Sequence, residues 1–489
     1  MCGILGAIAY DPAFSGIASL LWRGAKRLTH RGQEGWGMVT DHAFFHTTQG
    51  VYKYTGRLWD GLDRSAPVTL GGSAGLLQTL YTTTGKTSDR AARLRRIQPF
   101  IAYLGGDKEK PVAFVFNGTL MNWRELGAEC VQAGYQKEIF NDTAAIAALV
   151  EMAESASLED ALRDEILPRL QWSFSLIFLP LYRRELIVAR GMHGFMPLAL
   201  GIREGEFMVA ASEDWVFARG GLNCRTVGEV PRGTMMVLDP AHSPPLSEPI
   251  EWKHERVPAR YCLLHFIYFN HPGSTFCGRS VKEVQERAGE ALARRYPVDH
   301  AEVITWVNDS GRAAGQAYGR AMAERTGRWM FDGLVIYRER SADRAFIEPE
   351  EELRRAMVEG KHDMDRYAVA GKVVVVVDDS IVRATTMQWI VSLLFGAGAK
   401  EVHVRIASPP VKAPCRYGID TPTFGELAWN YCGEEKERVR GVIGATSLEY
   451  LLVEDNITAA CGGRAHYPCV LTTNSFCTEC FTGRDAVAP

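Results

Sequence analysis

A run of five valines, Val373 to Val377, followed at once by Asp378 and Asp379, constrains this chain more than any other stretch. Uninterrupted β-branched residues are typical of a strand buried on both faces of a parallel sheet. An apolar periodicity from Met387 to Phe395 then predicts a helix, whose N-terminus would favour a phosphate. Paired acids beside such an anion site suit a ligand with both phosphate and hydroxyl groups. An ordinary strand-to-helix turn with an acidic cap is the alternative.

The segment VVVVVDDSIVRATT resembles the phosphoribosyl-pyrophosphate (PRPP) loop of type I phosphoribosyltransferases, in the DDSIVR form of the glutamine PRPP amidotransferases. In that family the paired acids bind the ribose hydroxyls and the following loop binds the 5′-phosphate. The resemblance implies PRPP contacts from Asp378, Asp379, Ser380, Arg383, Ala384, Thr385 and Thr386. Ala384 stands where the family usually has glycine, and its methyl group can crowd a backbone that must approach phosphate closely.

The N-terminus carries a second, independent signal. A residue as small as Cys2 permits removal of Met1, which would leave a thiol and a free α-amine on one residue. An α-amine with a pKa of about 7.7 to 8.0 can act at neutral pH as the general base for its own thiol. From this one residue alone, a small side chain entering a buried strand is the better interpretation.

The opening CGIxG resembles the start of class II glutamine amidotransferases, and the resemblance favours a catalytic cysteine. HRGQE at residues 30–34, FVFNGTLMN around Asn117 and NDT around Asp142 extend the match. The resemblance implies that Cys2 is the nucleophile and that Asn117 and Gly118 form the oxyanion hole. It also implies that Arg31 and Asp142 bind glutamine.

The match fails where the family binds the glutamine α-carboxylate. GLLQTLYTTTG aligns with the family's GHxRYxTxG through Tyr81, Thr83 and Gly85, which puts Leu80 in the place of an arginine. Loss of a charge-assisted contact costs roughly 1.5 to 3 kcal/mol, or about one to two decades in affinity. We therefore expect glutamine use to be affected more than PRPP binding.

Further segments are expected at the PRPP site. The tetrad Asn308, Asp309, Ser310, Gly311 resembles the family's PDSG pyrophosphate loop. The segment 338–349 resembles its flexible loop, with Arg340 as the retained cation, and Lys361 aligns with a basic residue that faces phosphates. For any one arginine or lysine, a solvated surface charge is the commoner outcome. The implied Mg²⁺ ligands are water, Ser310, Asp378 and Asp379.

Cys477 and Cys480 form a CxxC pair whose spacing alone favours zinc over iron–sulfur, with an unligated pair also open. One branch of the amidotransferases ends in CxxCFTG and carries a 4Fe-4S cluster, whose other ligands match Cys262 and Cys415. The resemblance therefore implies a 4Fe-4S cluster on these four cysteines, with a structural role rather than one in electron transfer.

The chain has 489 residues, of which 46% are hydrophobic, enough for two or three domains with full cores. Short strands and turns, with acidic amphipathic helices near 142–155 and 158–168, predict a layered α+β domain in the first half. A doubly wound parallel sheet is predicted later, with its ligand at the strand ends. Its predicted strands are 303–307, 333–337, 373–377 and 402–408.

The resemblance gives these regions their expected folds. Residues 2–240 are expected to form a class II glutaminase domain of the N-terminal nucleophile (Ntn) hydrolase type. Residues 259–455 are expected to form an α/β type I phosphoribosyltransferase domain with a parallel sheet, and 456–489 a C-terminal tail. The proline-rich stretch around 239–258 predicts a linker.

Charge and hydropathy exclude several classes of protein. A net charge of −3, from 55 basic and 58 acidic residues, offers no overall field for nucleic acid. No apolar run approaches membrane-spanning length and no signal peptide is evident, so we expect a cytoplasmic protein. The family adds purine nucleotides as feedback inhibitors and a homodimer or homotetramer as expectations.

The resulting hypothesis is an amidophosphoribosyltransferase activity that makes 5-phosphoribosylamine from PRPP and glutamine, the first committed step of de novo purine synthesis. Leu80 keeps two alternatives open. One is a divergent paralogue that uses PRPP with ammonia or another nitrogen donor. The other is a non-catalytic, nucleotide-sensing relative.

Overall fold

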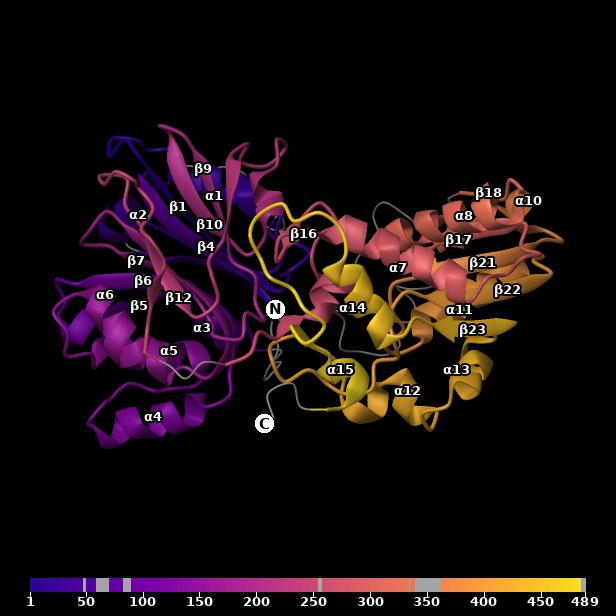
Figure 1. The fold of residues 1–489 in the computed structure, drawn as a ribbon. Helices are drawn as coiled ribbons and strands as arrows, with labels where there is room; N and C mark the ends of the chain where they lie inside the picture. Colours follow the sequence, from indigo (N-terminus) through magenta and orange to yellow (C-terminus); the bar gives the residue numbers. More distant parts are fainter. Residues whose placement is uncertain are drawn as a thin grey trace. The chain divides into compact units, whose positions relative to one another are not determined.

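The computed structural model describes residues 1–46, 50–58, 70–81, 89–253, 257–333, 335–338 and 362–484. The chain divides into two compact units, which can be followed by the colour bar of Figure 1. Unit 1 comprises Met1–Cys262, Arg416–Asp420 and Tyr467–Val470, and unit 2 comprises Leu263–Cys415, Thr421–His466 and Leu471–Pro489. The domain boundaries given above stay a prediction.

The described residues of unit 1 form two antiparallel sheets. The first has the order β11-β9-β10-β1-β4-β2-β3, with strands Arg225–Glu229, Ala199–Arg203, Phe207–Ala211, Gly3–Ala9, Ala74–Leu80, Gly35–Thr40 and Tyr52–Thr55. The second has the order β13-β12-β8-β7-β6-β5, with strands Ile250–Glu251, Thr234–Leu238, Leu186–Arg190, Trp172–Pro180, Pro111–Leu120 and Phe100–Tyr103.

The sheets of unit 1 face each other, and helices cover their outer faces. Ile4 and Leu76 of the first sheet share one core with Val115 and Ile177 of the second, because side chains on a strand alternate between its two faces. Helix α1 (Ile17–Ala25) packs on the other face of the first sheet. The remaining helices of this unit are α2 (Asp41–His46), α3 (Arg90–Arg96), α4 (Trp123–Gln132), α5 (Asp142–Glu151) and α6 (Leu158–Asp160).

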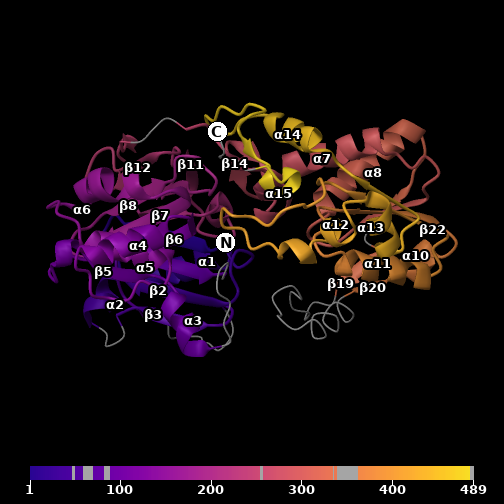
Figure 2. The same cartoon turned by 90° about the horizontal axis from the view of Figure 1, so that it is seen from below.

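Helix α5 differs from its prediction. It ends at Glu151 instead of Ser155, and every side chain from Thr143 to Val150 is buried, so it is not amphipathic. The reason is that α5 contacts β5 on one side and α4 and the helical turn at Ala161–Ile166 on others (Figure 2). The resulting order of helices, sheet, sheet and helices confirms the layered α+β class.

The stretch predicted as a linker is partly strand. Within it, β13 (Ile250–Glu251) pairs with β12 through Met235 and Thr234. Trp252 follows, and its side chain is 3% exposed in the core that includes α5. Proline and serine content indicated a linker, but these apolar side chains join unit 1.

The described residues of unit 2 form a parallel sheet of order β18-β17-β21-β22-β23. Its strands, in that order, are Phe331–Asp332, Val303–Trp306, Val373–Asp378, Glu401–Ile406 and Ser447–Tyr450. The main helices are α7 (Val281–Arg295), α8 (Arg312–Thr326), α11 (Thr385–Gly396), α13 (Lys436–Ile443) and α14 (Val453–Cys461). Short helices are α10 (Arg366–Val369), α12 (Ala428–Tyr431) and α15 (Glu479–Thr482).

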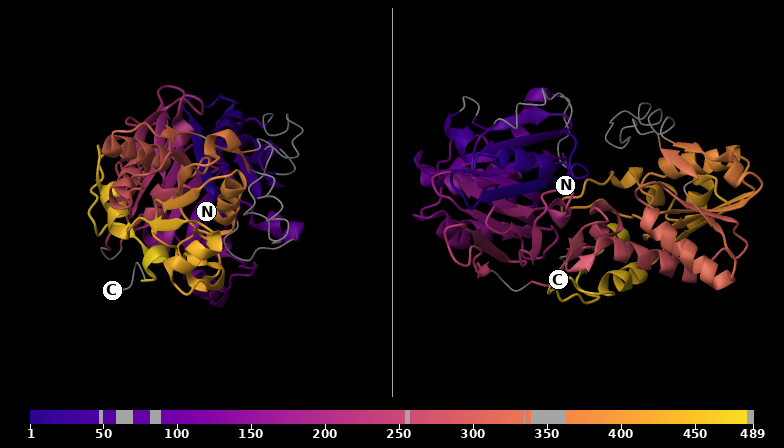
Figure 3. Two further views of the ribbon diagram at one scale, coloured as in Figure 1. Left: turned by 90° about the vertical axis from the view of Figure 1, so that its right-hand side faces the viewer. Right: turned by 90° about the horizontal axis from the view of Figure 1, so that it is seen from above.

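Strand β21 is buried along its whole length, as the valine run predicted. Val374 and Val376 face a core with α11 and α13, and α8 packs on β17 and β21 from the opposite side (Figures 1 and 3). The predicted strand 333–337 is wrong in its position. The sheet uses Phe331–Asp332, whereas β19 (Ile336–Arg338) pairs with β20 (His362–Met364) in a separate antiparallel ribbon.

The order of the parallel strands locates the ligand side of unit 2. Along the chain the strands run 2-1-3-4-5 across the sheet, so the winding reverses between β17 and β21. In open α/β sheets, ligands bind beyond the carboxyl ends of the strands at this switch point. The loops that leave β17 and β21 there contain Ser310 and Asp379.

None of the described helices of either unit has both the length and the hydropathy of a membrane span.

Candidate active sites

Cys2 lies beside the residues predicted to form its oxyanion hole. It immediately precedes β1, the strand between β4 and β10 in the first sheet of unit 1. Its backbone N–H donates to Asn117 Oδ1 at 3.1 Å, and its thiol lies 3.7 Å from the carbonyl oxygen of Tyr81. The fold therefore brings together residues that are 115 positions apart in the sequence.

Asn117 has an unused donor next to Cys2. Its side chain is fully buried, and its Nδ2 has no hydrogen-bond partner among the described residues. An unsatisfied buried amide is costly, so a buried group of this kind calls for a partner such as ordered water, an ion or a ligand. Asn117 Nδ2 can therefore donate to an oxyanion that forms on a carbonyl attacked by Cys2.

Gly118 adopts a conformation that requires glycine. Its φ is +155°, and a Cβ at this position would lie 2.0 Å from the carbonyl oxygen of Ser173 on the neighbouring strand β7. The close approach follows from the register in which Gly118 pairs with Phe174. Any side chain would push β6 away from β7 and move Asn117 with it.

Burial controls the ionisation of this site. Desolvation raises the pKa of the Cys2 thiol, and the carboxylates of Asp142 and Glu34 raise it further. Burial also lowers the pKa of the Met1 amine to about 6 and raises that of Asp142 to about 6. With Met1 attached, the Cys2 nitrogen is a peptide N–H and cannot act as a base. Thiol activation therefore needs a group that loss of Met1 would supply.

Arg31 supports the Cys2 segment. The guanidinium is buried, its Nε donates to the Cys2 carbonyl oxygen at 3.3 Å, and it forms an ion pair with Glu213. His30 Nε2 lies 2.8 Å from the same Glu213 oxygen. Glu213 was not predicted from the sequence, because it lies 182 residues from Arg31 in an unremarkable ASEDW segment.

Leu80 occupies the site in which the arginine was expected. It is the last residue of β4, is 6% exposed, and pairs with Gly35 of β2. The backbone carbonyl oxygen of the next residue, Tyr81, is the atom that the Cys2 thiol contacts. An apolar side chain therefore lies next to the residue that contacts the nucleophile. Thr83 and Gly85, which fix the alignment, lie outside the described residues.

In unit 2, the loops after β17 and β21 bring Ser310 and the two aspartates together. Ser310 Oγ donates to Asp378 Oδ1 at 2.7 Å, and the backbone N–H of Asp379 donates to the same oxygen at 2.9 Å. Gly311 permits this contact, since a Cβ there would lie 2.4 Å from the Val377 carbonyl oxygen.

No cationic side chain among the described residues pairs with the two carboxylates, and both are strongly desolvated. Burial raises the pKa of Asp378 to about 6 and raises that of Asp379 well above its usual range, with repulsion from Asp378 adding to the second shift. Ser380 Oγ donates to Asp379 Oδ1 at 2.8 Å, whereas Asp379 Oδ2 is buried without a partner among the described residues. Such a pair suits ribose hydroxyls and a divalent cation with oxygen ligands.

Both loops end at helix N-termini that no side chain caps. Gly311 precedes α8 and Ala384 precedes α11, and neither helix has a capping side chain. Ala384 has a φ of +66°, which explains why the family has glycine there, and its methyl group is buried in the sheet core. Thr385 and Thr386 are exposed at the first turn of α11, where backbone N–H groups can bind a phosphate.

The remaining residues predicted to bind PRPP are only partly described by the structure. Arg383 forms an ion pair with Glu426 at 3.1 Å. Hydrogen bonds from Thr423, followed by Arg383, hold the pKa of Glu426 at about 2. Asn308 and Asp309 lie in the loop after β17, where Asp309 has a φ of +68°. Arg340 and Lys361 lie outside the described residues.

Three of the four predicted cluster cysteines belong to unit 2. The backbone N–H groups of Lys412 and Ala413 donate to the Cys480 carbonyl oxygen at 2.7 and 3.2 Å, which brings the segment before Cys415 against the CxxC turn. Cys477 and Cys480 are 7% and 8% exposed. The fourth, Cys262, ends β14 (Tyr261–Cys262) in unit 1.

Known proteins similar to this chain match both its N-terminal and its C-terminal region. The family model described as glutamine amidotransferase domain matches residues 93–218, which include Asn117, Gly118 and Asp142. Amidophosphoribosyltransferase 2 of Arabidopsis thaliana, a chloroplast protein, is 34% identical over 495 residues, covering 100% of this chain and 80% of the relative. The chain belongs to the amidophosphoribosyltransferase family.

Solved structures of the family extend the likeness to the whole fold. Glutamine PRPP amidotransferase from B. subtilis, complexed with ADP and GMP, is 29% identical and superimposes with a TM-score of 0.80, covering 99% of this chain and 97% of that one. A structure described as the allosteric regulatory enzyme of purine biosynthesis gives a TM-score of 0.81 at 29% identity, covering 99% and 96%. This member of the family is thus an enzyme, a pentosyltransferase with a glutamine amidotransferase domain.

Proposed function

We propose that this chain makes 5-phosphoribosylamine in two linked steps, with Cys2 and the loops around Asp378 as its active sites. Cys2 attacks the glutamine side-chain amide, and hydrolysis of the resulting thioester gives glutamate and ammonia. The ammonia then displaces pyrophosphate from the anomeric carbon of PRPP. The single observation that carries the proposal is the unpartnered donor of Asn117 next to Cys2, in a chain whose relatives are amidophosphoribosyltransferases.

The first step needs an activated thiol. Because burial raises the pKa of the Cys2 thiol, the α-amine freed by removal of Met1 is proposed to accept its proton. Asn117 Nδ2 and the Gly118 N–H then donate to the oxyanion of the tetrahedral intermediate. Asp142, at the first turn of α5, is placed to bind the glutamine α-amine, and Arg31 holds the Cys2 carbonyl oxygen.

The second step uses the loops of unit 2. Asp378 and Asp379 are proposed to bind the ribose hydroxyls, while Ser380 to Thr386 bind the 5′-phosphate at the N-terminus of α11. Residues 308–311 are proposed to bind pyrophosphate at the N-terminus of α8. The unpartnered Asp379 Oδ2 and the two uncapped helices support this assignment. Arg340 and Lys361 stay predicted phosphate contacts from the sequence alone.

A second candidate function rests on Leu80. If nothing replaces the lost arginine, the PRPP chemistry is intact but glutamine binds weakly, and ammonia or another nitrogen compound is the physiological donor. The buried position of Leu80, one residue from the contact of the Cys2 thiol, favours this candidate specifically.

Cofactors and effectors are proposed on the same basis. Mg²⁺ fits Ser310 and the paired aspartates, because a hard cation prefers oxygen ligands and would relieve the repulsion between them. It would neutralise charge on the departing pyrophosphate.

A 4Fe-4S cluster is proposed for Cys262, Cys415, Cys477 and Cys480, supported by the contact of segment 412–413 with Cys480. Purine nucleotides are proposed as inhibitors because the B. subtilis relative was solved with ADP and GMP. A cytoplasmic homodimer or homotetramer stays a prediction.

The test is PRPP-dependent release of pyrophosphate with glutamine or with ammonium as donor. We expect release with both, and Cys2→Ala should abolish only the glutamine-dependent rate. Cys224→Ala, which removes another partly exposed thiol of unit 1, is the matched control and should retain both rates. Release with ammonium alone would establish the second candidate. No release with either donor would refute the catalytic assignment and leave the nucleotide-sensing alternative.

For the cluster, iron and sulfide are measured in an anaerobic preparation. We expect both to fall when any of the four cysteines is changed to serine. A colourless preparation whose zinc content falls when these cysteines are changed to serine would contradict the proposal.

A further inference from the structure

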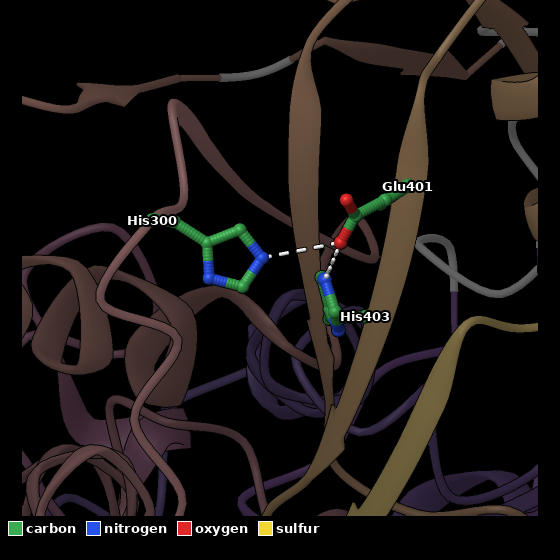
Figure 4. Close-up of side chains that lie close together, drawn as sticks. All are labelled: His300, Glu401 and His403. Carbon is green, nitrogen blue, oxygen red and sulfur yellow. Dashed lines mark hydrogen bonds and ion pairs between the residues drawn. The ribbon is translucent and has the colours of Figure 1, made fainter.

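A cluster of two histidines and one carboxylate lies in unit 2, away from the PRPP loops. His300 Nε2 and His403 Nε2 approach the same oxygen of Glu401, at 3.1 and 3.0 Å (Figure 4). The ligand atoms of all three residues lie within 4.8 Å of one another. Two imidazoles and a carboxylate that converge on one point are a common set of metal ligands.

The parallel sheet fixes the position of this cluster. Glu401 and His403 are two residues apart on β22, so their side chains share one face, and His300 precedes β17. All three are near the amino ends of the parallel strands. The PRPP loops leave the carboxyl ends of β17 and β21, at the opposite edge of the sheet. The cluster is therefore separate from the proposed active site.

The spacing of the donor atoms matches a small divalent cation. With bonds of about 2.0 Å, ligand atoms in a tetrahedral zinc site are roughly 3.3 Å apart. The two nitrogen-to-oxygen distances are already close to this value. The His300 side chain is 63% exposed, so it can rotate to close the remaining separation and leaves a coordination position open to water.

A second contact orients the buried histidine. His403 Nδ1 lies 2.8 Å from Ser447 Oγ on the neighbouring strand β23. When Nε2 binds a metal, Nδ1 carries the proton and donates it to such a partner, which fixes the tautomer and the ring. The nearby Arg405 guanidinium donates to Ser447 Oγ and to the carbonyl oxygens of Tyr296 and Val404, so its hydrogen bonds lead away from Glu401.

We propose that His300, Glu401 and His403 bind one divalent cation of the zinc class and thereby tie the segment before β17 to β22. The alternative is a metal-free trio in which each Nε2–H donates to Glu401. In the metal-bound form, both histidines shift their proton to Nδ1 and the cation replaces the two shared hydrogen bonds. Mg²⁺ is a poor fit, because two of the three donors are nitrogen.

The test measures bound zinc per full-length chain by equilibrium dialysis and elemental analysis, after removal of metal by a chelator. His300→Ala removes an exposed ligand and should leave the fold intact. Glu401→Gln provides a second variant. The matched control is His242→Ala, because His242 is also exposed and lies 2.6 Å from the carboxylate of Asp239. Cysteine sites are the same in all four proteins, so differences between them report on the histidine cluster.

We expect the wild type and His242→Ala to bind one more zinc ion per chain than His300→Ala and Glu401→Gln, or to bind it at least tenfold more tightly. Addition of zinc should raise the melting temperature of the first pair only, and Mg²⁺ should not. Co²⁺ should give visible bands in the wild type that are absent from His300→Ala, and the difference spectrum between the two proteins should lack the intense charge-transfer absorption of thiolate ligands. Equal zinc content and affinity in all four proteins would overturn the proposal and leave the hydrogen-bonded trio.

Discussion

The two candidate sites of this chain are built from opposite kinds of structure. In unit 1, Asn117 and Gly118 lie inside a buried antiparallel strand, and Cys2 enters the adjoining sheet. In unit 2, Ser310 and Asp379 lie in loops that leave parallel strands and run into helices. The first site is thus fixed by strand register, and the second by the conformation of two loops.

The departures from the family differ in the same way. In unit 1 the residues of the chemistry are retained and a recognition residue is replaced, since Leu80 stands in place of the arginine. In unit 2 the paired aspartates and Ser310 are retained, whereas Asn308 replaces a proline and Ala384 replaces a glycine. The backbone of Ala384 still adopts the left-handed conformation that glycine would. The substitution at Leu80 is thus expected to weaken glutamine binding while the nucleophile is kept. The substitution at Ala384 is expected to leave PRPP binding and chemistry intact, because the backbone keeps the same conformation.

The largest expected effect is loss of the PRPP reaction in unit 2. Asp378→Asn or Asp379→Asn should reduce pyrophosphate release to background with both glutamine and ammonium, because each carboxylate serves the ligand and not the apolar core. Glu449→Gln is the control, since it removes a carboxylate of the same sheet that pairs with Lys436. Circular dichroism checks the fold. Near wild-type activity of both aspartate variants would remove the assigned site.

The next effect concerns only the glutamine half. Asn117→Ala removes the unpartnered donor and should lower the glutamine-dependent kcat by about 10² to 10³, with the ammonium-dependent rate unchanged. Asn122→Ala is the matched control, because the Asn122 side chain is also buried but donates to the Arg169 carbonyl oxygen at 2.9 Å. That variant should lose stability rather than kcat. Equal loss of kcat in both would show a general disturbance of β6.

A smaller effect is expected on glutamine binding when the missing arginine is restored at position 80. Leu80→Arg should lower the glutamine KM by about one to two decades, by restoring a charge-assisted contact. Leu80→Met, which keeps the volume and adds no charge, should leave KM as it is. Steady-state kinetics with glutamine decides, and a KM that is the same in both variants would mean that the carboxylate binds elsewhere.

The smallest expected effect tests the compensation at Ala384. Ala384→Gly relieves a left-handed alanine, worth about 1 to 2 kcal/mol, but loses a buried methyl group and increases chain entropy in the unfolded state. The net change in the free energy of unfolding should be below about 1 kcal/mol. Ala397→Gly, at φ −79° immediately after the same helix, has no left-handed strain to relieve and should be destabilised more. Denaturant titration of both variants measures the difference, and equal destabilisation would refute strain at Ala384.

The fold was predictable where local pattern reflects burial directly. The valine run predicted β21 because a strand covered on both faces has no alternation to interrupt it. Strand β23 was missed, since Ser447–Tyr450 is an edge strand of alternating burial and too short to show a period. Helix α5 was predicted in type but not in environment, because burial on every side depends on neighbours distant in sequence.

The sites show the same limit. Cys2, Asn117 and Asp378 were predicted because each sits in a short motif. Glu213 has no such motif, and its role depends on contacts with His30 and Arg31, across more than 180 residues. The histidine cluster was also missed, although the spacing of Glu401 and His403 on one predicted strand is a signal that could have indicated it.

The most direct test of the central claim, that unit 1 keeps its nucleophile but has lost its carboxylate contact, is the steady-state comparison of glutamine with ammonium in the wild-type enzyme. We predict a glutamine KM above the ordinary range of about 1 μM to 1 mM, together with ammonium-dependent turnover of ordinary efficiency. A glutamine KM within that range would contradict this claim, because another residue would then have to bind the carboxylate in place of the arginine that Leu80 replaces.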